Sequence, residues 1–209
     1  MLGGTKWKRF ALVMVPTVAI AGGMTVMMAN GVLAASFAVS GQQFKVSADS
    51  LHGTNFVQSG DVIPAADGLH PVAVAGIQKA EIKNMCQSVN VPIPVLGNLT
   101  IVLKAGGSGD VEATNLVLDT NQVDASDATF KGVNIGASAA DVDAHTNIPG
   151  WQKHDSKGAP TAYAATDFAQ VVQDATLNNV KQTAYSTTAE TMTLPGLSIS
   201  ANLNGHECY

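Results

Sequence analysis

The sequence predicts an all-β domain that follows one N-terminal membrane-spanning helix. Three observations lead to this prediction: an uncharged apolar stretch near the N-terminus, short segments of alternating character through the rest of the chain, and clusters of Gly, Pro, Asn, Asp and Ser between them. Alternation with a period of two is typical of half-buried strands, and those five residue types are typical of turns.

The apolar stretch comes first in the chain. No charged residue occurs between Arg9 and Lys45, and this span exceeds the roughly 20 residues that cross a bilayer core. Lys6, Lys8 and Arg9 precede it, and basic residues stay on the cytoplasmic side of a membrane. The stretch therefore predicts a helix with its N-terminus inside the cell and the bulk of the chain outside.

Three regions follow from this orientation. We expect a basic cytoplasmic tail over residues 1–9, a single-pass transmembrane signal anchor over 10–39, and an extracytoplasmic all-β domain over 40–209. The alternative is cleavage near 34–35, where small residues suit a signal peptidase, which gives a secreted protein.

A strip of small residues lies within the expected anchor at helical spacing. It consists of Ala19, Gly22 and Gly23. Small residues let helices approach closely in lipid, so the strip predicts membrane helix packing. The alternative is that glycine is simply common in membrane helices.

Charge excludes one class of partner. Beyond residue 9 the chain carries eight lysines against sixteen acidic residues, a formal charge of −8. Such a surface repels nucleic acid, and the sequence has neither a basic stripe nor an aromatic stacking platform. We therefore expect no nucleic-acid binding.

The chain has two cysteines, Cys86 and Cys208. An exported protein with two cysteines favours one disulfide, which here ties the C-terminal segment to the middle of the domain. Two free thiols are the alternative.

Strand patterns recur along the exported region. Residues 44–48 alternate, residues 98–107 form a short apolar run closed by glycines, and residues 197–203 place apolar and polar residues on opposite faces. The apolar face of the last segment, which we expect to be buried, is formed by Leu197, Ile199, Ala201 and Leu203. Helical spacing occurs only briefly, over residues 168–175.

A weak repeat suggests how the strands are arranged. Segments of the form Ala-polar-apolar-polar-small-apolar begin at Ala80, Ala128 and Ala175. If each copy is one layer, the domain is a stacked β-roll or a β-helix-like fold. A β-sandwich is the alternative, because alternating strands also resemble one another by composition alone.

One segment departs from the strand pattern. Residues 139–161 contain prolines, glycines, charges and Trp151, and long excursions of this kind often carry function. Trp151 is a possible interface residue toward lipid, a subunit or a ligand, or else it plugs the open end of the fold. Acidic residues and histidines cluster here at spacings that match no metal motif, so we expect no metal site.

Catalytic motifs are missing from the sequence. Residues 106–110, "GGSGD", approach a nucleophile elbow but lack its final glycine, and we interpret them as a hairpin turn. Phosphate loops and dinucleotide-binding glycine patterns are also absent, so we expect no cofactor and no enzyme activity.

Five segments of the chain carry a resemblance to known sequences: "AASFAVSGQQFKVSAD", "GIQKAEIKNMCQSV", "VEATNLVLDTNQVDA", "ATLNNVKQTAYSTTAETMTLPGLSIS" and the terminal "ECY". Together they resemble an actinobacterial domain-of-unknown-function family. The resemblance implies an exported or membrane-anchored protein, with a small multi-span membrane protein as a possible partner. Some members carry the automatic label cholesterol esterase, but no catalytic residue transfers to this chain.

We therefore expect a non-enzymatic cell-envelope protein of the cytoplasmic membrane that contacts membrane lipid. It assembles with copies of itself as a homo-oligomer, or with a membrane partner. Lipid binding or transfer through an apolar groove is the alternative. Ester hydrolysis, with Ser108 as the residue to test, is the least favoured hypothesis.

Overall fold

Antiparallel strands dominate the computed structural model, which describes residues 42–65 and 68–209. The large sheet has nine strands. The strand bounds are β1 Phe44–Ala65, β2 Gly68–Lys83, β3 Met85–Ile93, β4 Gly97–Ala105, β5 Val111–Asp124, β6 Asp127–Ser138, β7 Lys153–His154, β8 Pro160–Thr161, β9 Phe168–Thr188, β10 Thr191–Thr193 and β11 Ser198–Leu203. The all-β class predicted from the sequence is confirmed.

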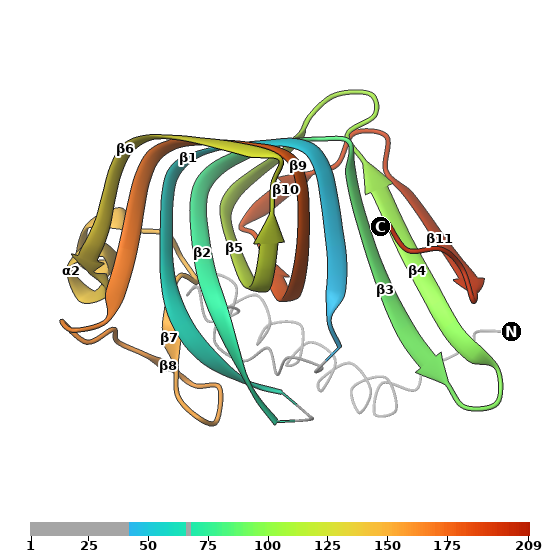
Figure 1. Ribbon diagram of the computed structural model, residues 1–209, viewed down its shortest axis with the longest axis horizontal. Coiled ribbons are helices and arrows are strands. Elements are labelled where there is room, and N and C mark those ends of the chain that lie inside the picture. Colours follow the sequence, from blue (N-terminus) through green and yellow to red (C-terminus); the bar gives the residue numbers. More distant parts are fainter. Residues whose placement is uncertain (1–41, 66–67) are drawn as a thin grey trace, which may run out of the picture. The chain divides into compact units, whose positions relative to one another are not determined.

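The large sheet follows the order β11-β4-β3-β1-β2-β5-β9-β6, and β10 pairs with β5. The long strand β1 pairs with β3 and β9 through its first residues, and with β2 from Ser50 onward. The pairings β1–β2, β2–β5, β5–β9 and β9–β1 therefore form a closed circuit. Figure 1 shows the result: the long strands arch over and the sheet folds back on itself.

Three asparagines bend the long strands. Asn55, Asn115 and Asn179 lie within β1, β5 and β9 and have φ angles of 52°, 47° and 49°. This left-handed conformation is unusual for residues other than glycine, but asparagine adopts it more readily than most. A left-handed residue inside a strand turns its direction.

The repeat corresponds to a shared bend rather than to stacked layers. The fifth residue of each copy, Asn84, Gly132 or Asn179, has a positive φ of 49°, 63° or 49°. Two of the copies are antiparallel partners, with Phe130 opposite Ala175. All pairings among the described strands are antiparallel, whereas successive rungs of a parallel β-helix pair in parallel.

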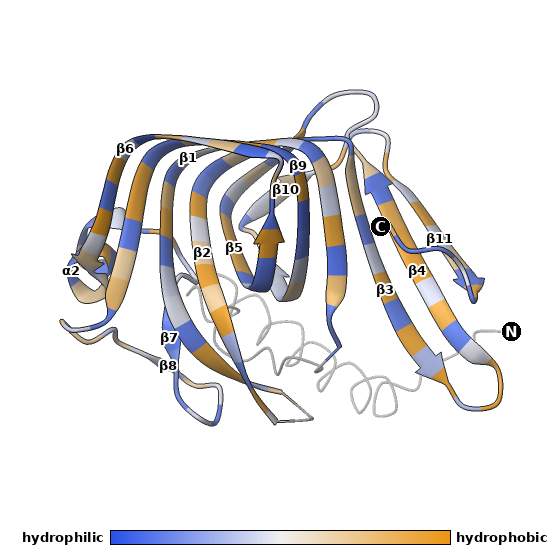
Figure 2. Ribbon diagram, viewed as in Figure 1, coloured by the Kyte–Doolittle hydropathy of each residue, from blue (hydrophilic) through white to orange (hydrophobic). Residues whose placement is uncertain are grey.

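The core has two clusters. The first lies among β1, β2 and β5, with Ile77 and Leu116 near its centre, and the second gathers Val57, Val74 and Trp151. The apolar residues alternate with polar ones along the strands, as Figure 2 shows. Burying these side chains is the main stabilising contribution to the sheet.

Strand β11 confirms the strand expected near residue 197, but its predicted half-burial is wrong. Each residue from Ser198 to Leu203 is exposed, because β11 is the outermost strand beside β4 and no described element covers it. Its alternation therefore marks a strand but not a buried face.

Three other local predictions can be compared with the structure. The long segment after β6 contains helix α2, Ala139–Thr146, while the helical spacing at 168–175 belongs to β9. Residues 106–110 are not a hairpin turn, since they connect β4 to β5, which pair with other strands.

The predicted anchor over 10–39, with Ala19, Gly22 and Gly23, lies outside the described residues. Within the part of the chain that the structure describes, no helix has the length and apolar character that a membrane span requires.

Candidate functional site

The segment between β6 and β9 covers one end of the sheet and is held there by Trp151. This side chain is 1% exposed, and its Nε1 donates a hydrogen bond to the main-chain oxygen of Val74 at 3.2 Å. Its ring lies against Gly76, where a Cβ atom would come within 3.1 Å of it, and 4.8 Å from the Tyr163 ring between centroids. Trp151 is thus a core residue that closes this end of the fold, and its burial argues against the interface role.

A buried carboxylate meets this segment from β1. The Asp61 side chain is only 2% exposed, and its Oδ2 accepts hydrogen bonds from the main-chain N–H of His154 at 2.9 Å and lies 3.0 Å from His154 Nδ1. Its Oδ1 accepts the N–H of Val62 at 2.8 Å. The hydrogen bond to Asp61 raises the pKa of His154, and the negative charges of Asp61, Asp119 and Asp155 add to this, although burial opposes it.

A second carboxylate, Asp119 on β5, lies near the same histidine. It is buried, and its Oδ1 has no hydrogen-bond partner within the described structure. Burial raises the pKa of Asp119, while a hydrogen bond with Ser186 and the charge of His154 act in the opposite direction. A buried acid without a partner on one oxygen is costly to ionise, which is the physical cause of the raised pKa of Asp119.

A neutral hydrogen bond completes the polar cluster. Ser59 Oγ donates to the Tyr163 phenol oxygen at 2.8 Å, and both residues are buried. Burial also raises the pKa of Tyr163, so the phenol stays neutral. We call Ser59, Asp61, Asp119, His154 and Tyr163 the buried polar cluster.

An open hollow lies beside the buried polar cluster, with a volume of about 640 Å³. Its walls are Gly60, Asp61, Val62, Leu69, Pro71, Val72, Lys153, His154 and Ser156. Apart from the residues of the Asp61–His154 pair and Lys153, the walls are mainly apolar, a combination typical of ligand sites. Chemically, the cluster offers one oriented imidazole that gains or loses a proton.

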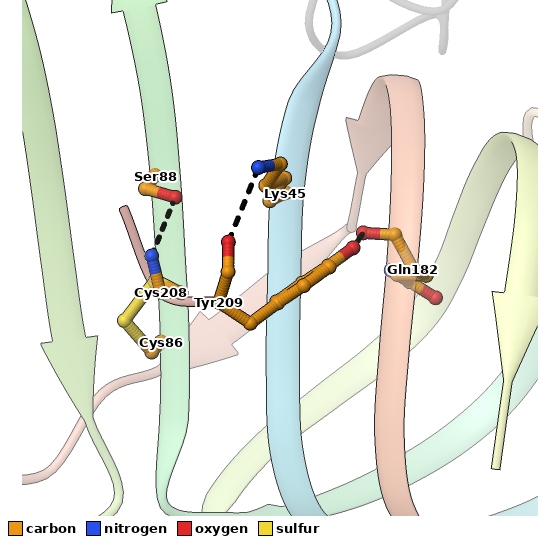
Figure 3. The surroundings of a disulfide bond; sticks show 6 residues. All are labelled: Lys45, Cys86, Ser88, Gln182, Cys208 and Tyr209. Carbon is orange, nitrogen blue, oxygen red and sulfur yellow. Dashed lines mark hydrogen bonds between the residues drawn. A yellow bond between two sulfur atoms is a disulfide. The ribbon is translucent and has the colours of Figure 1, made fainter. Parts of the chain in front are cut away.

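The opposite closure is the disulfide, which confirms the pairing predicted for Cys86 and Cys208. The Cys208 main-chain N–H donates to Ser88 Oγ at 3.0 Å, as Figure 3 shows. Beyond it, the Tyr209 hydroxyl donates to the main-chain oxygen of Gln182 at 2.8 Å. The last residues are therefore fixed across β3, β1 and β9.

Lys45 on β1 strengthens this closure. Its Nζ lies 2.7 Å from Glu207 Oε2 and donates to the main-chain oxygen of Tyr209 at 3.1 Å. The ammonium groups of Lys45 and Lys181 both lie over the Tyr209 ring, at 5.3 and 5.4 Å from its centroid. Cations over an aromatic face are attracted by its negative charge density.

The acidic and histidine residues of the 139–161 segment do not converge. His145 lies 3.6 Å from Asp141 within α2, whereas His154 contacts Asp61, and Asp155 accepts main-chain N–H groups of its own turn. Sequence reasoning missed Asp61 and Asp119 as partners. The available signal was an acid inside an apolar run, since Asp119 follows Leu116, Val117 and Leu118.

Comparison with known proteins gives one result. No curated protein and no solved structure matches this chain. A family model, described as a family of unknown function (DUF6230), matches residues 40–209. The match covers all of the strands described above, and the chain therefore belongs to this family of unknown function, DUF6230.

Proposed function

We propose that the chain is a non-enzymatic cell-envelope protein. Residues 10–39 hold it in the cytoplasmic membrane, and the β domain stands on the extracytoplasmic side. There it assembles with further copies or with a membrane partner. The closed circuit of strand pairings supports reading the domain as a β-roll with two free edges.

The observation that carries this proposal is that both edge strands expose large apolar side chains. On β6, Val133 and Ile135 are 44% and 66% exposed. On β11, Ile199 and Leu203 are 63% and 54% exposed. Exposed edge strands present unpaired main-chain groups, and soluble proteins usually protect them with charges, prolines or covering segments. Strand β11 carries no charged residue and no proline, so its free edge is suited to main-chain pairing with a strand of another molecule.

The mass of the full chain in detergent, measured by light scattering, tests the proposal. We expect an oligomer for the wild type, and a smaller species for Ile135→Lys and Ile199→Lys, because each places a charge at an edge. Val62→Lys is the control, since Val62 is 45% exposed on β1 and pairs with Pro71 of β2, so it lies on neither edge strand. A wild-type monomer, both with and without the N-terminal segment, rules out self-assembly.

The hollow beside the buried polar cluster favours a second candidate, lipid binding. Its apolar walls of Val62, Leu69, Pro71 and Val72 offer space of about 640 Å³. Mass spectrometry of lipids extracted from the purified protein tests this function. A stoichiometric lipid that is lost in Val72→Asp supports it, and protein without lipid contradicts it.

A further inference from the structure

The turn between β3 and β4 contains an unusual residue. The Leu96 N–H donates to the Ile93 main-chain oxygen at 3.1 Å, so residues 93–96 form a β-turn with Pro94 at its second position. Val95 at the third position has a φ of 73°. In turns with Pro second and a positive φ third, glycine or asparagine normally occupies the third position. A β-branched residue is strained there.

No packing compensates this strain. Val95 is 104% exposed, and Leu96 beside it is 58% exposed. The surrounding sequence is also uncharged from Asn84 to Leu103. The fold gains nothing from an exposed valine in a strained conformation, and strain of this kind is typical of positions with a role beyond packing.

The hairpin of β1 and β2 has a second exposed apolar tip. Leu69 and Val62 are 58% and 45% exposed, close to the end where Ala65 pairs with Gly68. Figure 2 colours the turn between β3 and β4 as hydrophobic. We call Val62, Leu69, Val95 and Leu96 the apolar tips.

The apolar tips lie at the end of the domain where the preceding chain joins β1. Phe44 pairs with Val89 and Ser47 with Cys86, so β1 begins on the side where β3 approaches its turn with β4. Strand β1 then arches, and its last residues return to the same side, as Figure 1 shows. Both tips and the start of β1 thus point the same way.

We infer that the apolar tips insert into the outer leaflet of the membrane that holds the N-terminal segment. This inference rests on the proposed anchoring by residues 10–39, whose apolar sequence joins the domain at this end. The domain carries a formal charge of −8 beyond residue 9, so charge attraction to anionic lipid does not drive the contact. Burial of apolar side chains at the headgroup boundary does.

Quenching of tryptophan fluorescence by brominated lipid tests the insertion. The full chain carries W7F, which leaves Trp151 as its tryptophan, and Trp151 is 1% exposed and held in the core. Into this background we introduce either L96W or S108W. Ser108 lies beyond the other end of the nine-residue strand β4, roughly 30 Å from the tip at about 3.4 Å per residue.

The proteins are reconstituted into phosphatidylcholine vesicles with brominated acyl chains. We expect severalfold stronger quenching for L96W than for S108W. Adding V95N to L96W keeps the positive φ but removes an apolar side chain, and we expect the quenching to fall. High salt should leave it unchanged.

The outcomes separate the inference from the proposed function. If the protein floats with the vesicles but L96W and S108W are quenched equally weakly, the anchoring stands and the insertion is wrong. The tip then serves a protein partner instead. If the full chain does not float with the vesicles, both the anchoring and the insertion are overturned.

Discussion

The C-terminal residues and the segment between β6 and β9 close two parts of the same sheet by different means. The C-terminal closure uses a covalent bond, Cys86–Cys208, with Lys45 as a charged support. The other closure uses a buried ring, Trp151, and the Asp61–His154 pair. Both lay irregular chain over strands of the sheet.

The two closures differ in how their contributions to stability depend on solution conditions. A disulfide stabilises mainly by restricting the unfolded chain, so its contribution does not depend on protonation. The Asp61–His154 pair contributes most while His154 is charged, because the hydrogen bond to Asp61 is the main cause of the raised pKa of His154. A change of pH should therefore alter the contribution of the Asp61–His154 pair and leave that of the disulfide unchanged. Reduction of the disulfide should have the opposite effect.

The largest expected effect comes from removing the covalent closure. The double variant Cys86→Ala, Cys208→Ala opens a loop with a sequence separation of 122 residues. On the chain-entropy model this lowers the free energy of unfolding by about 5 kcal/mol. Urea denaturation at pH 5 and pH 8 measures it, and the loss should be equal at both. A loss that changes with pH contradicts the assignment of the two closures.

Trp151→Ala should have the next largest effect. The side chain is 1% exposed and its removal leaves a cavity over Gly76, so we expect a loss of about 4 kcal/mol in the free energy of unfolding. Trp151→Phe is the milder companion, since it keeps most of the ring but loses the hydrogen bond to Val74. Equal stability of Trp151→Ala and the wild type in urea would show that this ring does not close the fold.

The pH dependence of stability sharpens the comparison. The folded-state pKa of His154 is raised above 6.5, so its contribution is complete below about pH 6.5 and is lost as the pH rises through the folded-state value. The pKa of Asp119 is also raised, which makes stability fall with rising pH from about 3.8 upward. We therefore expect the melting temperature to decrease from pH 6 to pH 8.

His154→Gln should flatten this slope and lower stability at pH 5 by about 1 kcal/mol, the usual size of a net hydrogen-bond contribution. His145→Gln is the control, because His145 is 75% exposed on α2, where its Nδ1 lies 2.7 Å from the main-chain oxygen and 3.6 Å from the carboxylate of Asp141. If His145→Gln flattens the slope as much as His154→Gln, the buried polar cluster is not its source.

The smallest effect belongs to Lys45→Met. The ion pair with Glu207 is partly exposed, at 31% and 24% for the two side chains, so the loss should be below about 1 kcal/mol. Lys131→Met is a matched surface control, with a longer and more exposed contact to Asp174 at 3.5 Å. A loss as large as that of the double variant Cys86→Ala, Cys208→Ala would show that Lys45 contributes as much to the C-terminal closure as the disulfide does.

Local patterns in the sequence predicted several elements of the fold. Alternation located β1 and β11, since a period of two reflects the strand backbone itself, and an apolar run closed by glycines located β4. The cysteine count gave the disulfide, because two cysteines allow one pairing. The repeat marked a real backbone feature, although it encodes left-handed residues at Asn84, Gly132 and Asn179 rather than stacked layers.

Only the tertiary structure shows which residues these elements contact and which of their faces are buried. The sequence could not pair Asp61 with His154, which lie 93 positions apart, or show that Trp151 is buried. It also could not show that β11 is uncovered, because alternation predicts two faces but not which neighbour covers either. Burial depends on where distant strands are placed, and that placement follows from the closed circuit of pairings, not from any single segment.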